Sequence, residues 1–167
     1  SLIEKIYFMK NKLILSSLGG SLIAPDDIDW KFLKKFKELI LKFVKNKYRF
    51  IIITGGGHTA RKYQSAILKI GVLNSEDRDW IGIHSTRLNG HLLRTIFRAD
   101  AHPRINKNPH EKFDFRAKIL IASGCKPGFS TDLDTLIPAT DYVAKTAIHL
   151  SNIHQSYPKA PRPSNDA

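Results

Sequence analysis

The chain has 167 residues, 42% of them hydrophobic, so it can bury the single core of one globular domain. Its one cysteine, Cys125, excludes an internal disulfide framework and fits a reducing cytoplasm, and no apolar run is long enough to span a bilayer. The formal net charge of +12 is compatible with a nucleic-acid partner or an anionic surface, but many of the lysines gather on one amphipathic segment, which favours a solvated helix face on a soluble protein.

The first third of the chain alternates between strand and helix patterns. Residues 12–17 and 49–54 are apolar runs of strand length, and the segment between them has helical periodicity up to about Lys45. Either Asp27 or Asp29 can cap that helix at its N-terminus. The residues expected on its inner face are Leu33, Phe36, Ile40 and Phe43.

Two more helices are expected after the second strand. In the pattern at 59–70 the Thr59 hydroxyl can cap the N-terminus, and Gly71 can end the helix in the left-handed C′ conformation. A longer helix begins near Asp77, because acidic residues suit the positive end of the helix dipole, and it runs to Phe97. The apolar residues that mark its periodicity are Ile81, Leu88, Leu92 and Leu93.

The rest of the chain returns to strand patterns. Residues 101–116 are rich in Pro, Asn, His and Lys and indicate a surface loop, which a strand at 118–122 follows. The helix expected after Asp132 is short or kinked because Pro138 lies inside it, and residues 144–150 form a fourth strand. Because strands and helices alternate, we predict a three-layer α/β/α sandwich with a largely parallel central sheet.

Glycine-bearing loops follow three of the predicted strands. Gly19 and Gly20 come after the first strand, residues 55–57 are three glycines after the second, and residues 123–132 follow the third. Glycine allows positive φ and close backbone approach, and the N–H groups at a helix N-terminus favour an anion. Alone, one such loop is better explained as a tight turn between packed elements. Because parallel strands end at the same edge of a sheet, the loops together predict one cleft that binds phosphate.

Five segments form a combination that is far more specific than any single motif: SLGGS at 17–21, GGGHTARKY at 55–63, DWIGI at 79–83, TRLN at 86–89 and PGFSTD at 127–132. In order and nearly in spacing, this combination resembles the amino-acid kinase superfamily, and within it the archaeal-type UMP kinase branch. The resemblance covers the chain after about the first ten residues. It implies the amino-acid kinase fold and an enzyme that transfers the γ-phosphoryl group of ATP to UMP, with Mg²⁺ as a cofactor.

The resemblance assigns the ATP side of the site to the first two glycine loops and to the end of the chain. Arg61 would stabilise the charge that spreads over the transferring phosphoryl group, and the alternative is an ordinary surface charge. Asp132 would organise magnesium or orient the acceptor, so Arg61 and Asp132 are the candidate catalytic residues. The expected ATP-binding residues are Gly19, Gly20, Ser21, Gly57, Arg61, Ser151, Asn152 and Tyr157.

The UMP side is assigned to the second and third loops and to the helix between them. Asp79 would hold the ribose hydroxyls, and the alternative is a helix first-turn charge worth at most ~1 kcal/mol. Ser130 and Thr131 would bind the acceptor phosphate, for which a turn with a helix cap is the competing account. Arg87 and Asn89 belong to a motif typical of the branch, with a helix-surface or subunit-contact role at least as favoured. The expected UMP-binding residues are Gly56, Asp79, Cys125, Lys126, Pro127, Gly128, Phe129, Ser130 and Thr131, and no metal-ligand set is expected.

The family continues past the point where this chain stops, so the resemblance implies one domain that is incomplete at its C-terminus. An acceptor-side lobe would span about 12–135, and the start of an ATP-side lobe about 136–167. Family members are hexamers, so we expect a cytoplasmic homo-oligomer that acts in pyrimidine nucleotide synthesis, without a membrane or nucleic-acid partner. The alternatives are another phosphotransferase of the superfamily, a non-catalytic nucleotide-binding remnant, and a basic protein that binds RNA.

Overall fold

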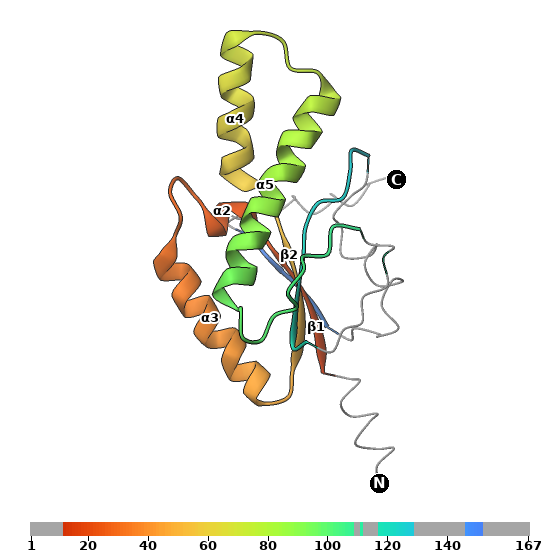
Figure 1. The fold of residues 1–167 in the computed structure, drawn as a ribbon. Helices are drawn as coiled ribbons and strands as arrows, with labels where there is room; N and C mark the ends of the chain where they lie inside the picture. The colour runs from red at the N-terminus through yellow and green to blue at the C-terminus, as the bar shows by residue number, and fades with distance from the viewer. Residues whose placement is uncertain (1–11, 109–110, 112–116, 129–145, 152–167) are drawn as a thin grey trace, which may run out of the picture.

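A parallel sheet forms the centre of the molecule (Figure 1). The computed structural model describes residues 12–108, 111, 117–128 and 146–151. Within them the strands are adjacent in the order β3-β2-β1-β4, and every pairing is parallel. The predicted strands are confirmed to within two residues, and the helix expected around Pro138 lies outside the described residues. The strands are β1 (Leu13–Leu18), β2 (Arg49–Thr54), β3 (Ile119–Ala122) and β4 (Thr146–Leu150).

Strands β1, β2 and β3 are largely apolar because both of their faces are buried, as is usual for parallel sheets. Successive side chains of a strand point to opposite faces, so β1, β2 and β3 each contribute to two hydrophobic clusters. The first includes Ile14, Leu18, Phe50, Ile52, Ile119 and Ile121. The second, on the opposite face, is made of Leu13, Leu15, Ile51, Ile53, Leu120 and Ala122.

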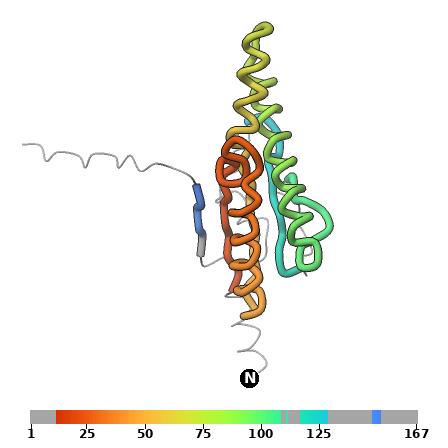
Figure 2. The backbone as a smooth tube through the Cα atoms, turned by 90° about the vertical axis from the view of Figure 1, so that its left-hand side faces the viewer, coloured from red at the N-terminus to blue at the C-terminus, as the bar shows by residue number. Residues whose placement is uncertain are grey.

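Two long helices cover the first of these faces. Helices α3 (Trp30–Lys45) and α5 (Ser75–Ile96) run in front of the sheet in the view of Figure 2. Phe36 of α3 meets Phe97, which directly follows α5, with ring centroids 6.2 Å apart in an edge-on arrangement. The same cluster includes Leu93 of α5, which is fully buried. Helices α3 and α5 therefore form one helix layer of the predicted three-layer sandwich.

The polar residues at the start of α3 and α5 act as side-chain caps. Asp29 Oδ1 accepts a hydrogen bond from Phe32 N at 2.9 Å, so Asp29 rather than Asp27 is the cap of α3. Asn74 Oδ1 accepts from Asp77 N at 2.8 Å and starts α5 two residues before the predicted Asp77. Asn is a strong N-cap residue, and its side-chain oxygen satisfies the Asp77 N–H, which explains the earlier start of the helix.

Two of the apolar residues that define the predicted helical patterns are not buried. Phe43 of α3 is 38% exposed, and Val44 is buried in its place. The Phe43 ring lies at the rim of the core, where it packs edge-on against Tyr48. Leu88 of α5 is 62% exposed, because this part of the helix turns a face of small and polar side chains inward.

Helix α4 (Gly57–Ile70) differs from the prediction at both ends. It begins two residues before Thr59, so Thr59 lies in the first turn, and no side chain caps the helix. Gly71 follows the helix with φ −171°, an extended conformation and not the left-handed one predicted. Helix α4 packs on α5 and on the short helix α2 (Gly20–Ile23), and with the start of α5 it extends beyond the sheet (Figure 1).

The described part of the predicted surface loop at 101–116 is partly buried. Ala101 and Asn106 form parallel bridges to Ile119 and Ala122 of β3. Ile105 and Asn106 are both buried. The prediction of an exposed loop is therefore wrong for these residues, because the segment satisfies its backbone hydrogen bonds along the free edge of β3.

Candidate functional site

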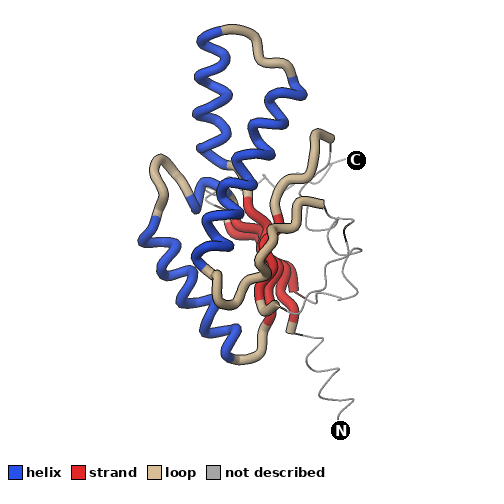
Figure 3. The backbone as a smooth tube through the Cα atoms, in the orientation of Figure 1, coloured by secondary structure: helices blue, strands red, loops and turns tan. Residues whose placement is uncertain are grey.

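The carboxyl ends of the strands lie at one edge of the sheet, and the loops that leave them meet there (Figure 3). Gly19 N donates to Leu150 O at 2.8 Å, and Gly55 N donates to Leu18 O at 2.9 Å. These bonds continue the pattern of the sheet by one residue beyond β1 and β2. The loops after β1, β2 and β4 are therefore held together by backbone, as the predicted shared cleft requires.

The first two glycine loops interlock. A Cβ atom added to Gly20 would lie 2.4 Å from Gly57 N, and one added to Gly57 would lie 2.3 Å from Gly20 C. Gly57 also has φ +56°, in the left-handed region that favours glycine. The close contact between the loops thus explains why glycine occupies these two positions. It also places the N-termini of α2 and α4 next to each other.

These two helix ends differ from those of α3 and α5. Neither α2 nor α4 has a side-chain cap, so no side chain occupies the first N–H groups of these helices, the arrangement that favours an anion at a helix N-terminus. Arg61 is exposed on α4, and its Nη2 donates to Ser21 Oγ of α2 at 3.2 Å. A Cβ atom on Gly19 would lie 3.5 Å from Ser151 Cα. Except for Asn152 and Tyr157, which lie outside the described residues, the residues predicted to bind ATP are thus close together.

A cleft of about 430 Å³ lies between α5 and the loop after β3. Several residues predicted to bind UMP are among those that line it: Asp79, Lys126, Pro127 and Gly128. The remaining lining residues are Gln64, Arg78, Gly82, Ile83, Thr86 and Gly124. Gly82, Ile83 and Thr86 belong to motifs already singled out in the sequence. Gln64 and Arg78 carry no such signal, because only the packing of α4 on α5 brings them to the cleft.

Gly56 joins the two parts of the site. A Cβ atom at this position would lie 3.0 Å from Gly82 O and 3.3 Å from Ser85 Cβ, so the glycine loop touches α5 where that helix lines the cleft. Gly56 also precedes the uncapped end of α4. The cleft and the paired helix N-termini are therefore parts of one continuous site.

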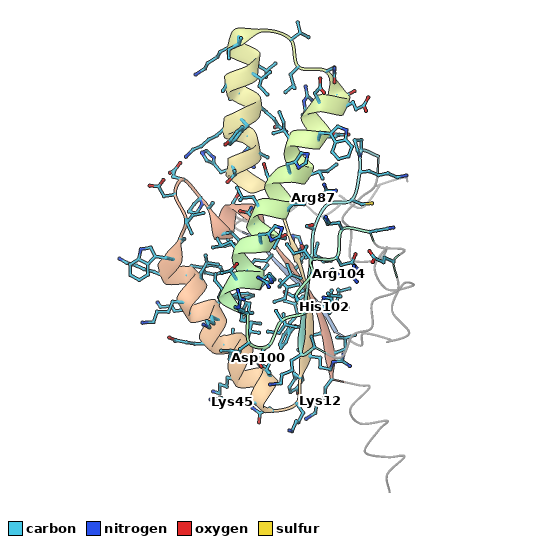
Figure 4. The ribbon with its side chains drawn as sticks, viewed as in Figure 1. Lys12, Lys45, Arg87, Asp100, His102 and Arg104 are labelled. Carbon is cyan, nitrogen blue, oxygen red and sulfur yellow. The ribbon has the colours of Figure 1, made fainter. Side chains whose placement is uncertain are left out.

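Polar side chains of α5 donate hydrogen bonds to the backbone of the loops after β2 and β3. Asn89 is only 2% exposed, and its Nδ2 donates to Gly55 O at 2.8 Å. Arg87 donates to the carbonyl oxygens of Gly124 and Cys125, and it lies on the side of α5 that faces this loop (Figure 4). For both residues the sequence leaves a helix-surface or subunit-contact role open beside a role in the family motif. The surface role is wrong for Asn89, and Arg87 is half-buried against the loop.

Other predicted residues contribute less to the described site. The carbonyl of Cys125 accepts from Arg87, and its half-buried side chain is not among those that line the cleft. Phe129, Ser130, Thr131 and the candidate catalytic Asp132 lie outside the described residues. Within the part that is described, no group of three or more His, Cys, Asp and Glu residues could hold a metal ion, and no helix has the length and apolar character to cross a membrane.

Comparisons with known proteins agree on one family. A sequence profile described as "Amino acid kinase family" matches residues 12–113. The uridylate kinase of Thermoplasma volcanium is 31% identical over 160 residues, which are 94% of this chain and 68% of that protein. The uridylate kinase of Methanobrevibacter smithii is 30% identical over 156 residues, 92% of this chain and 68% of that protein.

A solved structure shows the same fold. The crystal structure of uridylate kinase from Archaeoglobus fulgidus matches this chain with a TM-score of 0.66 at 24% sequence identity. The match covers 91% of this chain and 69% of that one. The predicted amino-acid kinase fold is confirmed, and the chain spans about two thirds of the length of these relatives.

Proposed function

Because this chain belongs to the amino acid kinase family, we propose that it transfers the γ-phosphoryl group of ATP to UMP, giving ADP and UDP. The relatives that are named uridylate kinase support this acceptor. The observation that carries the proposal is the junction at Gly56, where the uncapped N-terminus of α4 meets the cleft beside α5. A donor phosphate and an acceptor can therefore lie next to each other.

The donor side binds phosphate without covalent chemistry. In this proposal, backbone N–H groups at Gly20, Ser21 and Gly57 provide donors, and the helix dipole of α4 favours negative charge at its N-terminus. Arg61 adds a guanidinium beside Ser21, where it stabilises charge on the transferring phosphoryl group. Catalysis then consists of positioning and charge stabilisation. The remaining donor-side residues of the proposal are Gly19, Ser151, Asn152 and Tyr157.

The acceptor side binds the nucleoside and its phosphate in the cleft. A volume of about 430 Å³ lies in the range of small-molecule sites, which is roughly 300–1,000 Å³. Asp79 lines one wall and accepts hydrogen bonds from the ribose hydroxyls, while Lys126 and the Gly128 backbone lie on the opposite loop. The proposal also includes Gly56, Cys125, Pro127 and the residues at 129–131.

Magnesium enters this reaction with the nucleotide. Mg²⁺ in kinases is held by one or two carboxylates together with the substrate phosphates. The described residues around the glycine loops offer N–H groups and cations but no carboxylate cluster, so they fit the phosphates and not the metal. No step is assigned to the metal through these residues. Asp132, the acid proposed for this role, lies outside the described residues.

The family resemblance also supports a cytoplasmic homo-oligomer, with a hexamer as the expected state. Light scattering on the purified chain measures the assembly directly. A single species of hexamer mass supports this part of the proposal, and a monomer contradicts it without affecting the proposed reaction.

The proposed reaction is tested by ADP formation from MgATP with each of four acceptors: UMP, CMP, acetylglutamate and isopentenyl phosphate. We expect turnover with UMP, a large loss in Arg61→Ala, and no loss in Lys69→Ala, because Lys69 lies in the last turn of the same helix, away from the loops. Turnover that is the same in both variants would indicate a contaminating kinase. Preference for another acceptor would replace UMP within the same family.

A further inference from the structure

One turn of α5, residues 86–89, contacts two of the loops at the carboxyl edge of the sheet. On one side, Gly124 N donates to Thr86 Oγ1 at 2.8 Å. On the other side, Asn89 donates to Gly55 O, and the Thr54 hydroxyl donates to Thr86 O at 2.8 Å. The same helical turn therefore fixes the loop after β3 relative to the glycine triplet after β2.

Arg87 adds two further contacts, one of them the shortest of this group. Its Nε donates to Gly124 O at 3.2 Å, and its Nη2 donates to Cys125 O at 2.6 Å. Because peptide groups are planar, holding two successive carbonyls also fixes the direction of the N–H groups that follow them. The next residues of the chain, Lys126 to Gly128, line the acceptor cleft.

We propose that Arg87 is a positioning residue for the acceptor: it holds the backbone at Gly124 and Cys125 so that residues 126–128 keep the shape of the UMP cleft. This inference rests on the proposed function for its substrate. Arg87 is not among the cleft-lining residues, so it acts through the loop and not by touching the nucleotide. Two of the guanidinium donors are used by the Gly124 and Cys125 carbonyls, as expected of a side chain that holds the loop in place.

The geometry explains why an arginine is needed. A guanidinium is a planar fork that can bond two neighbouring acceptors at once, whereas a lysine ammonium is a single point charge on a flexible stem. The Arg87 guanidinium carbon also lies 6.0 Å from the centre of the Trp80 ring. Trp80 in turn stacks on His84, with centroids 5.8 Å apart. This stack limits the orientations of the Arg87 side chain and favours the fork seen at the loop.

The test compares Arg87→Gln and Arg87→Lys with a control, Arg98→Gln. The control removes the same charge at an exposed position just after the C-terminal end of α5. Hydrogen bonds from charged groups are strong, so we expect the KM for UMP to rise roughly 10- to 100-fold in Arg87→Gln. The KM for ATP stays unchanged, because the donor side does not depend on this loop. Arg87→Lys recovers only part of the loss, and Arg98→Gln matches the wild type.

Hydrogen exchange of the free protein gives a readout that needs no activity. Amides of residues 123–128 exchange faster in Arg87→Gln than in Arg98→Gln, while those of β2 keep their rates. Equal exchange and equal KM values in the two variants would overturn the inference, and so would full recovery in Arg87→Lys, which indicates a role of charge alone. A wild type without UMP-dependent turnover would refute the proposed function, and faster loop exchange would then still support the positioning role of Arg87.

Discussion

Replacing Gly57 by alanine tests the interlock of the glycine loops, because this position combines a left-handed backbone with a lack of space. Its φ is +56°, and the new Cβ would lie 2.3 Å from Gly20 C and 2.4 Å from Ser21 N. The left-handed conformation costs an L-residue roughly 1–2 kcal/mol, and overpacking typically costs about 1–3 kcal/mol. We expect Gly57→Ala to lower the free energy of unfolding by about 2–5 kcal/mol, a large part of a typical domain's stability.

Substitutions at two further glycines separate the cost of the backbone conformation from the cost of the steric overlap. Gly20→Ala introduces the overlap without a positive φ, so it is expected to cost about 1–3 kcal/mol. Gly71 has no atom within 4 Å of the added Cβ and an extended backbone at φ −171°. Gly71→Ala is therefore expected to be neutral or to stabilise by ~0.4–1 kcal/mol through the unfolded chain.

Urea unfolding followed by circular dichroism measures all three variants under the same conditions. The slope with urea should stay constant, so that a shift of the midpoint reports stability alone. The reasoning is refuted if Gly57→Ala is as stable as Gly71→Ala. If Gly20→Ala loses as much as Gly57→Ala, the backbone conformation contributes nothing and the overlap explains the whole effect.

Two other predictions concern single carboxylates. Asp29→Ala removes the cap of α3 and should cost about 1 kcal/mol in urea unfolding, whereas Asp27→Ala should cost nothing; equal losses would contradict the assignment of the cap. Asp79→Asn should raise the KM for UMP at unchanged melting temperature, because Asp79 is exposed on the wall of the cleft. An unaltered KM would remove Asp79 from the acceptor site.

The sheet and its helices could be predicted because their signals are local. The strands at 49–54 and 119–122 are short apolar runs, and α3 has apolar residues at helical spacing. The glycine loops could also be predicted from the sequence, since each directly follows such an apolar run. Their meeting at one edge follows from the parallel order of the strands, so the outline of the site could be inferred before its geometry was known.

The polar contacts between distant segments could not be predicted in the same way. Asn89 bonds a carbonyl 34 residues earlier in the chain, and Arg87 bonds one 37 residues later. Both lie in a helix that has few buried apolar residues, where periodicity does not distinguish an inward polar side chain from a solvated one. The local pattern likewise predicts a loop at Asn106, because its partner, Ala122, lies in a strand that comes later in the chain.

Transfer of label from γ-³²P-ATP is the measurement that tests the central claim most directly. The account predicts that the purified chain forms labelled UDP when UMP is the acceptor, and that Arg61→Ala forms much less while Lys69→Ala forms as much as the wild type. Release of labelled inorganic phosphate without labelled UDP, or equal labelling in both variants, would contradict it.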